Sequence, residues 1–497
     1  MKIKKFIKKA LLVVLAYFCI QALCAAAWYI RKYGDTGFMS IISTFMSPWK
    51  GCANTLKQSY RYYVSIPTYI ITALFALILF YRGKLKLVIK EKQIYPFTDK
   101  WSTWICVIVS ITCLTIAMCS VHFPTYLYDT FLTQSTLYEE EYVDPRDVTI
   151  TFPEEKRNLV YIYLESMETS YLSKELGGGS TENLIPELYD LAMENINFSH
   201  SDGVGGWPRV THATWTSAAM VSQTSGVPLT VDIKNIDLSN FRGYLPGAVN
   251  LQNILHDAGY YQTLMVGSDG SFGGRKEYFE DHGADHVYDL YTAREDGIIP
   301  EDYMVWWGFE DVKLFDYAKQ ELTKIAAGDQ PFAFTLLTVD THHVDGYFCE
   351  LCGKDHSEQY SNVLSCSSRQ VLSFVQWLQE QDFYENTTVI ICGDHPSMDN
   401  QYFVRNISED YERHVYNCII NSPIEANNTK NRVFTPMDMF PTTLAALGCE
   451  ISGDRLGLGT NLFSETPTVA ERIGIEKLNR EISKYSEYYS EKLIGES

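Results

Sequence analysis

The chain has 497 residues and a formal net charge of −20, and its charges are unevenly distributed. Residues 1–100 contain 16 Lys and Arg against 3 Asp and Glu, whereas the remaining residues contain 25 against 58. The acidic body argues against nucleic-acid binding, because a phosphate backbone requires a basic surface. An aromatic content of 14% argues against a disordered chain.

Three long uncharged runs occupy the basic front of the chain. We expect transmembrane helices at residues 10–30, 64–81 and 101–121, because each run is long enough to cross the apolar core of a bilayer. The first run also suits a cleaved signal peptide, but it is long for that role and two further spans follow. Positive charges at the N-terminus and between residues 82 and 100 place both segments in the cytoplasm, so the chain beyond residue 121 is expected outside the membrane.

The rest of the chain divides by its pattern of apolar residues. Residues 122–156 have no sustained apolar period and are expected to form a linker, residues 157–465 a catalytic domain, and residues 466–497 a tail with an amphipathic helix. Within the domain, short β-rich runs alternate with helix-like stretches. The strand-like runs are 158–166, 332–343 and 387–395, and the helix-like stretches are 246–258, 311–325 and 367–381. This alternation predicts an α/β sandwich with its ligands at the carboxyl ends of the strands.

Polar side chains follow each strand-like run where it ends. Glu165 follows the first run, the Asp-Thr-His-His sequence of residues 340–343 ends the second, and Asp394 and His395 end the third. Each of these alone is weak evidence, because an isolated acid at a strand end is usually a cap or a solvated loop residue. Together they combine carboxylate oxygen with imidazole, a ligand set suited to Mn²⁺, Mg²⁺ or Zn²⁺.

A nucleophile is expected in the stretch from residue 203 to residue 229. Its hydroxyl residues precede an Ala/Met/Val run, as if a loop ended and a helix began at Thr216 or Ser217. A hydroxyl at a helix N-terminus is well placed to act on an anionic phosphate or sulfate group, and a metal ion would lower its pKa. A capping role for Thr216 is the simpler alternative. The pattern alone does not choose among Thr211, Thr214, Thr216 and Ser217.

The cysteines of the body allow several interpretations. Cys349 and Cys352 form a C-x-x-C sequence, and Cys366 follows 14 residues later. A disulfide from this loop to Cys366, unpaired thiols, and metal or redox chemistry all stay open. Cys392 and Cys418 lie in apolar runs and are expected to be small core residues.

Several sequence pieces resemble the lipoteichoic-acid-synthase and phosphoglycerol-transferase family, most closely the phosphoglycerol transferases that act on periplasmic glucans. In chain order the pieces are NLVYIYLES, WTSAAMVSQTSGVPL, RKEYFEDHGADHVYD, LTVDTHHVDGYF, SCSSRQVLSFVQWL, VIICGDH and DMFPTTLAALG. The resemblance covers residues 157 to about 463, behind membrane helices. It implies an alkaline-phosphatase/sulfatase-like α/β fold in a bacterial cell membrane.

The resemblance also implies roles for individual residues. The implied metal ligands are Glu165, Thr216, Asp394 and His395. Thr216 matches the nucleophile, so that it is also a catalytic residue, and the implied metal is Mn²⁺, with Mg²⁺ as the alternative. His342 matches the histidine beside the glycerophosphate group, which gives it catalytic and substrate-binding roles. Arg275 matches the arginine that holds the phosphate.

The chain also departs from that family's pattern. Gly273 stands two positions before Arg275, where the synthases carry Trp, and residues 266–267 read Val-Gly where a His is usual. These differences favour transfer of a single unit over polymer synthesis. Pro396 and Ser397 follow His395 in place of the frequent Tyr-Gly.

The expected reaction is transfer of sn-glycerol-1-phosphate through a phospho-threonine intermediate. The expected donor is phosphatidylglycerol in the membrane, and the acceptor is a cell-envelope glycan or a teichoic-acid-type polyglycerolphosphate. The alternatives are a phosphoethanolamine transferase, a sulfatase-like phosphodiester hydrolase, and a non-enzymatic membrane sensor. Sulfatases need a C/S-x-P-x-R motif, and only Trp207-Pro208-Arg209 faintly resembles it, without a usable nucleophile.

Overall fold

The computed structural model describes residues 2–34, 37–38, 41–42, 54–81, 87–89, 92–94, 99–230 and 244–495. The chain forms two compact units, one containing residues 1–39 and 53–128, the other containing residues 40–52 and 129–497.

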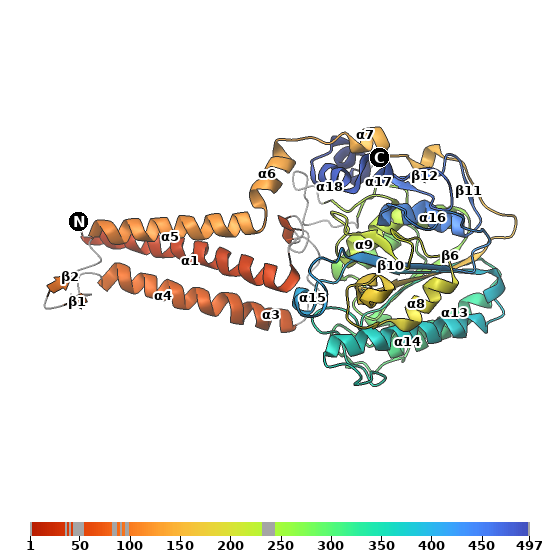
Figure 1. The fold of residues 1–497 in the computed structure, drawn as a ribbon, viewed down its shortest axis with the longest axis horizontal. Coiled ribbons are helices and arrows are strands. Elements are labelled where there is room, and N and C mark those ends of the chain that lie inside the picture. The colour runs from red at the N-terminus through yellow and green to blue at the C-terminus, as the bar shows by residue number, and fades with distance from the viewer. Residues whose placement is uncertain are drawn as a thin grey trace. The chain divides into compact units, whose positions relative to one another are not determined.

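The first unit contains the apolar helices (Figure 1). Its elements are α1 Lys2–Tyr33, α3 Asn54–Tyr60, the π-helical turn η1 Arg61–Ser65, α4 Ile66–Tyr81, the hairpin strands β1 Leu87–Ile89 and β2 Lys92–Ile94, and α5 Asp99–Ser120; the division between the units falls within α6 Phe123–Phe131. By length and composition, Phe6–Tyr33, Lys57–Phe80 and Thr103–Ser120 could each cross a membrane. Each candidate overlaps one expected span. The basic loop used to orient them lies mostly outside the described residues.

A seven-stranded sheet in the order β5-β10-β9-β4-β8-β6-β7 organises the second unit. Its strands are β4 Asn158–Leu164, β5 Gly206–Pro208, β6 Tyr261–Val266, β7 His286–Tyr288, β8 Phe332–Leu337, β9 Thr387–Gly393 and β10 His414–Ile420. The strands from β9 to β7 in this order are parallel to one another, and β10 is antiparallel to both β9 and β5. The parallel strands β8, β4 and β9 are neighbours, so their carboxyl ends meet at one edge.

Helices cover both faces of this sheet, with α9 and α16 on one face and α8, α13 and α14 on the other (Figure 1). The helices are α7 Leu137–Glu141, α8 Pro186–Glu194, α9 Thr216–Ser225, α10 Leu251–Asp257, α11 Arg275–Asp281, α12 Leu290–Glu295, α13 Asp311–Ala326, α14 Gln359–Gln379, α15 Asn400–Asn406, α16 Met439–Ala446, α17 Val469–Ile473 and α18 Ile475–Ser483. Short helical turns are η3 Pro145–Asp147, η4 Thr169–Tyr171, η5 Lys174–Leu176, η6 Phe272–Gly274, η7 Tyr384–Asn386, η8 Pro436–Asp438 and η9 Tyr489–Ile494, and the short strands are β3 Ile150–Thr151, β11 Glu450–Ile451, β12 Arg455–Leu456 and β13 Gly459–Thr460.

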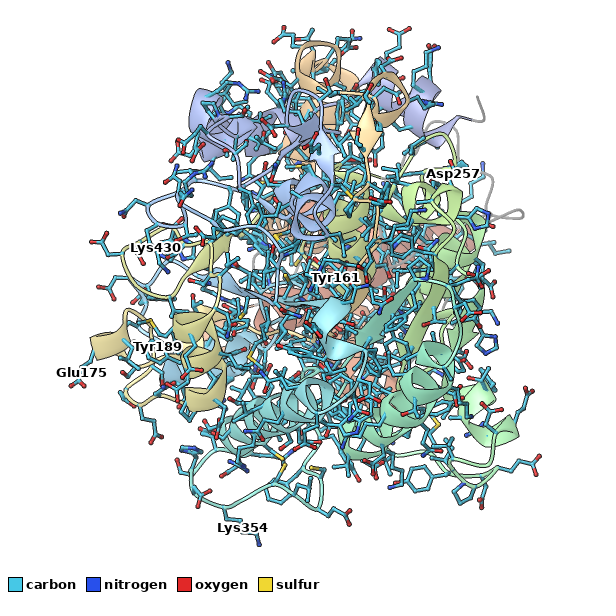
Figure 2. The ribbon with its side chains drawn as sticks, turned by 90° about the vertical axis from the view of Figure 1, so that its right-hand side faces the viewer. Tyr161, Glu175, Tyr189, Asp257, Lys354 and Lys430 are labelled. Carbon is cyan, nitrogen blue, oxygen red and sulfur yellow. The ribbon has the colours of Figure 1, made fainter. Side chains whose placement is uncertain are left out.

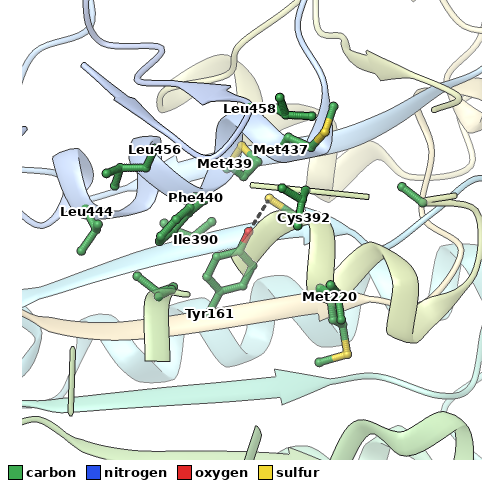
Figure 3. Close-up of a cluster of buried hydrophobic side chains, with 14 of the residues drawn as sticks. Tyr161, Met220, Ile390, Cys392, Met437, Met439, Phe440, Leu444, Leu456 and Leu458 are labelled. Carbon is green, nitrogen blue, oxygen red and sulfur yellow. Dashed lines mark hydrogen bonds between the residues drawn. The ribbon is translucent and has the colours of Figure 1, made fainter. Parts of the chain in front are cut away.

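Central strand β4 is buried on both faces, which explains its nearly continuous apolar sequence. Val160 and Ile162 pack against the α13–α14 face, and Tyr161 packs against the α9–α16 face. Figure 3 shows the Tyr161 hydroxyl pointing to the Cys392 sulfur, 3.7 Å away, beneath Phe440 and its neighbours. Cys392 is thus a buried core residue.

At both ends of the body, the chain packs into the core beyond the expected bounds of the catalytic domain. The expected linker 122–156 contains helices, and Leu137 and Tyr138 are buried in the core. The tail 466–497 forms α17, α18 and η9, which bury Leu478 and Tyr489 in the same core. Tyr138 and Tyr489 contact each other with ring centroids 5.1 Å apart. A contact between residues so distant in sequence produces no periodic pattern of apolar residues, so it cannot be predicted from either segment alone.

Burial on β4 predicts a measurable difference between two identical substitutions. Val160→Ala removes two methyl groups from a fully buried site and should lower the free energy of unfolding by about 2 kcal/mol. Val404→Ala on α15, where the side chain is 77% exposed, should change it by less than about 0.5 kcal/mol. Thermal and urea unfolding of the detergent-purified protein measure both values, and equal losses would contradict the assignment of β4 to the core.

Candidate functional site

The carboxyl ends of β4 and β9 are joined through one carboxylate. Asp394 Oδ1 accepts hydrogen bonds from the backbone N–H groups of Ser166 and His395, both at 2.7 Å. The Asp394 N–H in turn donates to the Leu164 carbonyl oxygen at 3.1 Å. Ser166 adopts a positive φ of 55°, an uncommon conformation that directs its amide to Asp394. Glu165, between Leu164 and Ser166, is thereby held beside Asp394.

A compact buried group, here called the metal-type group, consists of Glu165, Asp394 and His395. Each offers one ligand atom, and these atoms lie within 4.8 Å of one another. The side chain of His395 is oriented by its own backbone, because Nδ1 lies 2.9 Å from the Pro396 carbonyl oxygen, which can only accept a hydrogen bond. In the neutral ring, Nε2 therefore carries the lone pair and faces the two carboxylates. This is the arrangement in which a histidine binds a metal ion.

The electrostatics of this group favour a cation. Burial and the neighbouring Glu165 charge raise the pKa of Asp394 to about 7. Burial opposes protonation of His395, but Asp394 and Glu165 outweigh it and raise its pKa. Asp394 Oδ2 is buried without a hydrogen-bond partner among the described residues. Two buried carboxylates, an imidazole lone pair and a vacant oxygen fit a divalent metal ion.

Thr216 is the first residue of α9 and points at this group. Its Oγ1 lies 3.2 Å from Glu165 Oε2 and 3.4 Å from His395 Nε2. No such contact to the metal-type group is found for Thr211, Thr214 or Ser217 in the described parts of the chain. The geometry therefore selects Thr216 from the four hydroxyl candidates, and places its oxygen where a metal ion and a helix N-terminus would both act on it.

Arg275 is the first residue of α11 and lines the same cavity as Glu165 and Thr216. One of its terminal nitrogens, Nη2, donates to Ser268 Oγ at 3.0 Å and to the Asp269 carbonyl oxygen at 2.9 Å. Its Nε is buried without a hydrogen-bond partner among the described residues. Arg275 is thus a fixed, buried cation that keeps an unpartnered N–H at Nε beside the nucleophile candidate, as binding of an anionic group requires.

His342 and Trp307 form another wall of this cavity. His342 Nδ1 lies 2.8 Å from the His343 carbonyl oxygen, so the neutral ring carries its lone pair on Nε2. Burial lowers the pKa of His342, although Glu165 opposes the effect. The Trp307 ring lies 4.4 Å from the His342 ring and 5.2 Å from that of Phe272. Its indole Nε1 is buried without a partner among the described residues.

The structure brings together the six residues to which the resemblance assigns roles: Glu165, Thr216, Arg275, His342, Asp394 and His395. Their individual roles stay predictions. Asp340 does not join them, because it pairs with the backbone N–H of Asp311 and burial raises its pKa to about 10. The cavity is also lined by Ser268, Phe272 and Trp307, which were not predicted from the sequence. Only the Trp306-Trp307-Gly308 sequence indicates an aromatic wall.

A buried ion pair supports the loop that follows His395. Arg413 forms a two-point contact with Glu168, whose side chain is fully buried, and donates to the Ser397 carbonyl oxygen at 2.7 Å. The Ser397 N–H donates to Glu168 Oε1 at 2.6 Å. The Pro396-Ser397 sequence that departs from the family pattern is therefore held by a carboxylate and a guanidinium beneath the metal-type group.

Removal of the Glu168 charge should destabilise the protein. Glu168→Gln leaves Arg413 without its counter-charge, and we expect a loss of about 3 kcal/mol in unfolding free energy, the low end for a broken buried pair because the Arg413 side chain is 29% exposed. Glu175→Gln, at an exposed acid (Figure 2), should leave the value within about 0.5 kcal/mol. Thermal unfolding in detergent measures both; an unchanged Glu168→Gln variant would contradict the supporting role of the pair.

Comparisons with known proteins place this site in a family. The sulfatase family model matches residues 157–449. Phosphoglycerol transferase I of Escherichia fergusonii is 28% identical over 322 residues, which cover 63% of this chain and 40% of that relative. The chain thus spans about two fifths of the length of the curated relatives it matches.

Solved structures show weaker likeness. An alkaline phosphatase superfamily protein from Vibrio parahaemolyticus is 20% identical, with a TM-score of 0.48 over 65% of this chain and 74% of that one. The lipoteichoic acid synthase LtaP from Listeria monocytogenes is 18% identical, with a TM-score of 0.49 over 64% and 79%. Because both TM-scores lie below 0.5, the assignment rests on the sequence match. That match covers more than half of the chain, and the chain therefore belongs to the sulfatase family.

Proposed function

We propose that the protein is a phosphoglycerol transferase. It would move sn-glycerol-1-phosphate from phosphatidylglycerol to a cell-envelope glycan or polyglycerolphosphate acceptor. The observation that carries the proposal is the Thr216 hydroxyl, which contacts Glu165 and His395 and shares a cavity with Arg275. A threonine in this position, rather than a sulfatase motif, suits transfer of a phosphoryl group. The similarity to phosphoglycerol transferase I supports the choice of the transferred group.

Glu165, Asp394, His395 and the Thr216 hydroxyl would hold the metal ion, with Mn²⁺ or Mg²⁺ as the proposed occupant. When bound, such an ion lowers the pKa of a coordinated hydroxyl and neutralises charge on a phosphoryl oxygen. The residues themselves supply the rest of the arrangement. Ser166 Oγ donates to Glu165 Oε1 at 2.8 Å, which turns Oε2 towards Thr216.

In the proposed first step, the deprotonated Thr216 Oγ1 attacks the phosphorus of the phosphodiester. The bond from phosphorus to the diacylglycerol oxygen breaks, and a glycerophospho-threonine forms. Arg275 binds the anionic phosphoryl oxygens, with its free Nε available as donor. His342, which lines the same cavity and enters this step protonated on Nε2, gives that proton to the departing diacylglycerol oxygen. Burial lowers the pKa of His342, which favours release of the proton.

In the second step, His342 acts in the reverse direction. Its Nε2 lone pair takes the proton of the acceptor hydroxyl, whose oxygen attacks phosphorus and displaces Thr216. The ring is then protonated for the next cycle, so the protons balance over the two steps. A reaction through a covalent threonine intermediate predicts ping-pong kinetics.

The chain also carries its own attachment to the donor's membrane. Three helices near the N-terminus are long and apolar enough to cross it. The membrane domain would be residues 1–121. The catalytic domain would be residues 157–465 together with the flanking segments that share its core, on the extracytoplasmic side of a bacterial membrane. This arrangement would give the site access to phosphatidylglycerol without release of the lipid into water.

The first test is capture of the intermediate. The purified protein is incubated in detergent and Mn²⁺ with phosphatidylglycerol labelled in its head group, and then analysed by intact mass and peptide mapping. We expect one glycerophosphate on the peptide that contains Thr216, together with release of diacylglycerol. Thr216→Ala should form no adduct and lose turnover by at least about a thousandfold, because the nucleophile is absent.

Thr216→Ser is the matched control, because it keeps the hydroxyl and should still form the adduct. Chelation of the metal should stop the reaction, and added Mn²⁺ should restore it. An adduct that forms only from labelled phosphatidylethanolamine would identify a phosphoethanolamine transferase. Release of glycerophosphate to water without an adduct would identify a hydrolase, and full activity of Thr216→Ala would refute the mechanism.

The unpartnered Trp307 indole N–H predicts a contribution to substrate binding. Trp307→Phe keeps the ring contacts to His342 and Phe272 but removes the buried donor. We expect the KM for phosphatidylglycerol to rise about fivefold with little change in kcat, because one hydrogen bond contributes about 1 kcal/mol.

Trp306→Phe is the control for this prediction, since Trp306 is absent from the cavity wall and its ring lies 6.0 Å from that of His342. Its KM should stay within about twofold of the wild type. Rates of diacylglycerol release over a range of lipid concentrations measure both variants. Equal KM values for wild type and Trp307→Phe would show that the indole N–H does not contact the substrate.

A further inference from the structure

Three cysteines meet on the α14 side of the domain, outside the cavity described above. Cys349 Sγ lies 3.6 Å from Cys352 Sγ and 3.6 Å from Cys366 Sγ. Cys349 and Cys366 are buried and Cys352 is half-buried. Cys349 and Cys352 belong to a tight turn after β8, in which the Cys352 N–H donates to the Cys349 carbonyl oxygen at 3.2 Å. Cys366 comes from α14.

The spacing of the sulfurs separates two kinds of chemistry. A disulfide bond holds its two sulfurs about 2.05 Å apart. The three cysteines are not joined by such a bond in this structure. A metal ion about 2.3 Å from each sulfur in a tetrahedral site holds the sulfurs about 3.8 Å apart. The two distances of 3.6 Å are close to that value, and all three sulfurs lie within 4.8 Å of one another. The cluster thus has the dimensions of a three-thiolate metal site.

A side-chain donor from α14 is directed at the sulfurs. The Gln370 side-chain amide, one turn after Cys366 on α14, donates to Cys366 Sγ at 3.4 Å. The same amide nitrogen also lies 3.9 Å from Cys349 Sγ, within hydrogen-bonding distance of a sulfur. Donors aimed at sulfur are the groups that stabilise metal-bound thiolates.

We propose that Cys349, Cys352 and Cys366 form a zinc site, with its fourth position open to water because Cys352 is half-buried. Zn²⁺ fits a C-x-x-C turn completed by a distant cysteine, whereas Mn²⁺ and Mg²⁺ prefer oxygen ligands. This site is therefore chemically distinct from the group formed by Glu165, Asp394 and His395.

The zinc site would fix the segment that carries His342. Tyr360 on α14 donates to the Thr341 carbonyl oxygen at 2.8 Å, and the Tyr347 N–H donates to the Asp340 carbonyl oxygen at 2.7 Å. A metal bridge from Cys349 to Cys366 adds a second attachment of the same segment to α14. Lys354, near the tip of this loop, lies at the edge of the domain in Figure 2.

The test uses the full-length protein in detergent, reduced with a thiol-free phosphine and freed of metals. Co²⁺ is added as the probe, because sulfur-to-cobalt charge-transfer absorption in the near ultraviolet reports only thiolate ligands. We expect one thiolate-bound Co²⁺ per chain, displaced by one equivalent of Zn²⁺. Cys352→Ser should lose this absorption, while Cys449→Ser, at a buried cysteine outside the cluster, should keep it.

Two further measurements separate the possible results. Glu165→Gln removes a ligand of the proposed catalytic metal and should keep the charge-transfer absorption, so failure of the proposed function leaves this result unaffected. Zn²⁺ should raise the melting temperature of the wild type and not that of Cys352→Ser. Absence of the absorption in the reduced wild type would overturn the proposal. A protein purified without reductant that is two hydrogens lighter than the reduced form, with Cys349 in a disulfide, would also overturn it.

Discussion

The site depends on Asp394, which accepts two backbone hydrogen bonds at the point where β4 and β9 end. Parallel neighbours bring their carboxyl ends to the same edge, so the topology alone places Glu165 and Asp394 close together. Two carboxylates in a buried position repel each other, and burial raises the pKa of Asp394 further. A divalent cation would relieve both costs, which is why this pair of carboxylates suits the metal of the proposed reaction.

The departures from the family pattern have a local cause in the packing around Arg275. Gly273 has a φ of 69°, and a Cβ there would lie 2.6 Å from Ser217 Oγ. A tryptophan therefore cannot stand two positions before Arg275 in this backbone. The aromatic wall comes instead from Trp307, on a segment between β7 and α13. Trp307 thus forms the wall beside His342, on the side of the cavity where the proposed substrate would meet the protein.

The sequence predicted those features that a short stretch of chain determines by itself. Strand β4 and the polar residues at its end follow from an apolar run that stops at Glu165, and α9 begins at Thr216 as expected. Features that depend on distant partners were missed. Trp307 joins the cavity through contacts with residues more than 30 positions away, and Glu168 meets Arg413 across 245 positions. Tyr138 and Tyr489, in the expected linker and tail, likewise pair only in the folded core.

One stretch of chain connects the metal-type group with the cluster of Cys349, Cys352 and Cys366. The segment after β8 passes His342 at the cavity wall and reaches Cys349 beside α14 within seven residues. Thr341 Oγ1 donates to the Glu165 carbonyl oxygen at 2.6 Å, so this segment is also attached to the end of β4. A general acid–base group must keep its position to within a fraction of an ångström through two opposite proton transfers. His342 lies in a loop without regular secondary structure. Attachment of this loop to β4 through Thr341 and to α14 through Cys366 would hold the His342 side chain in a fixed position.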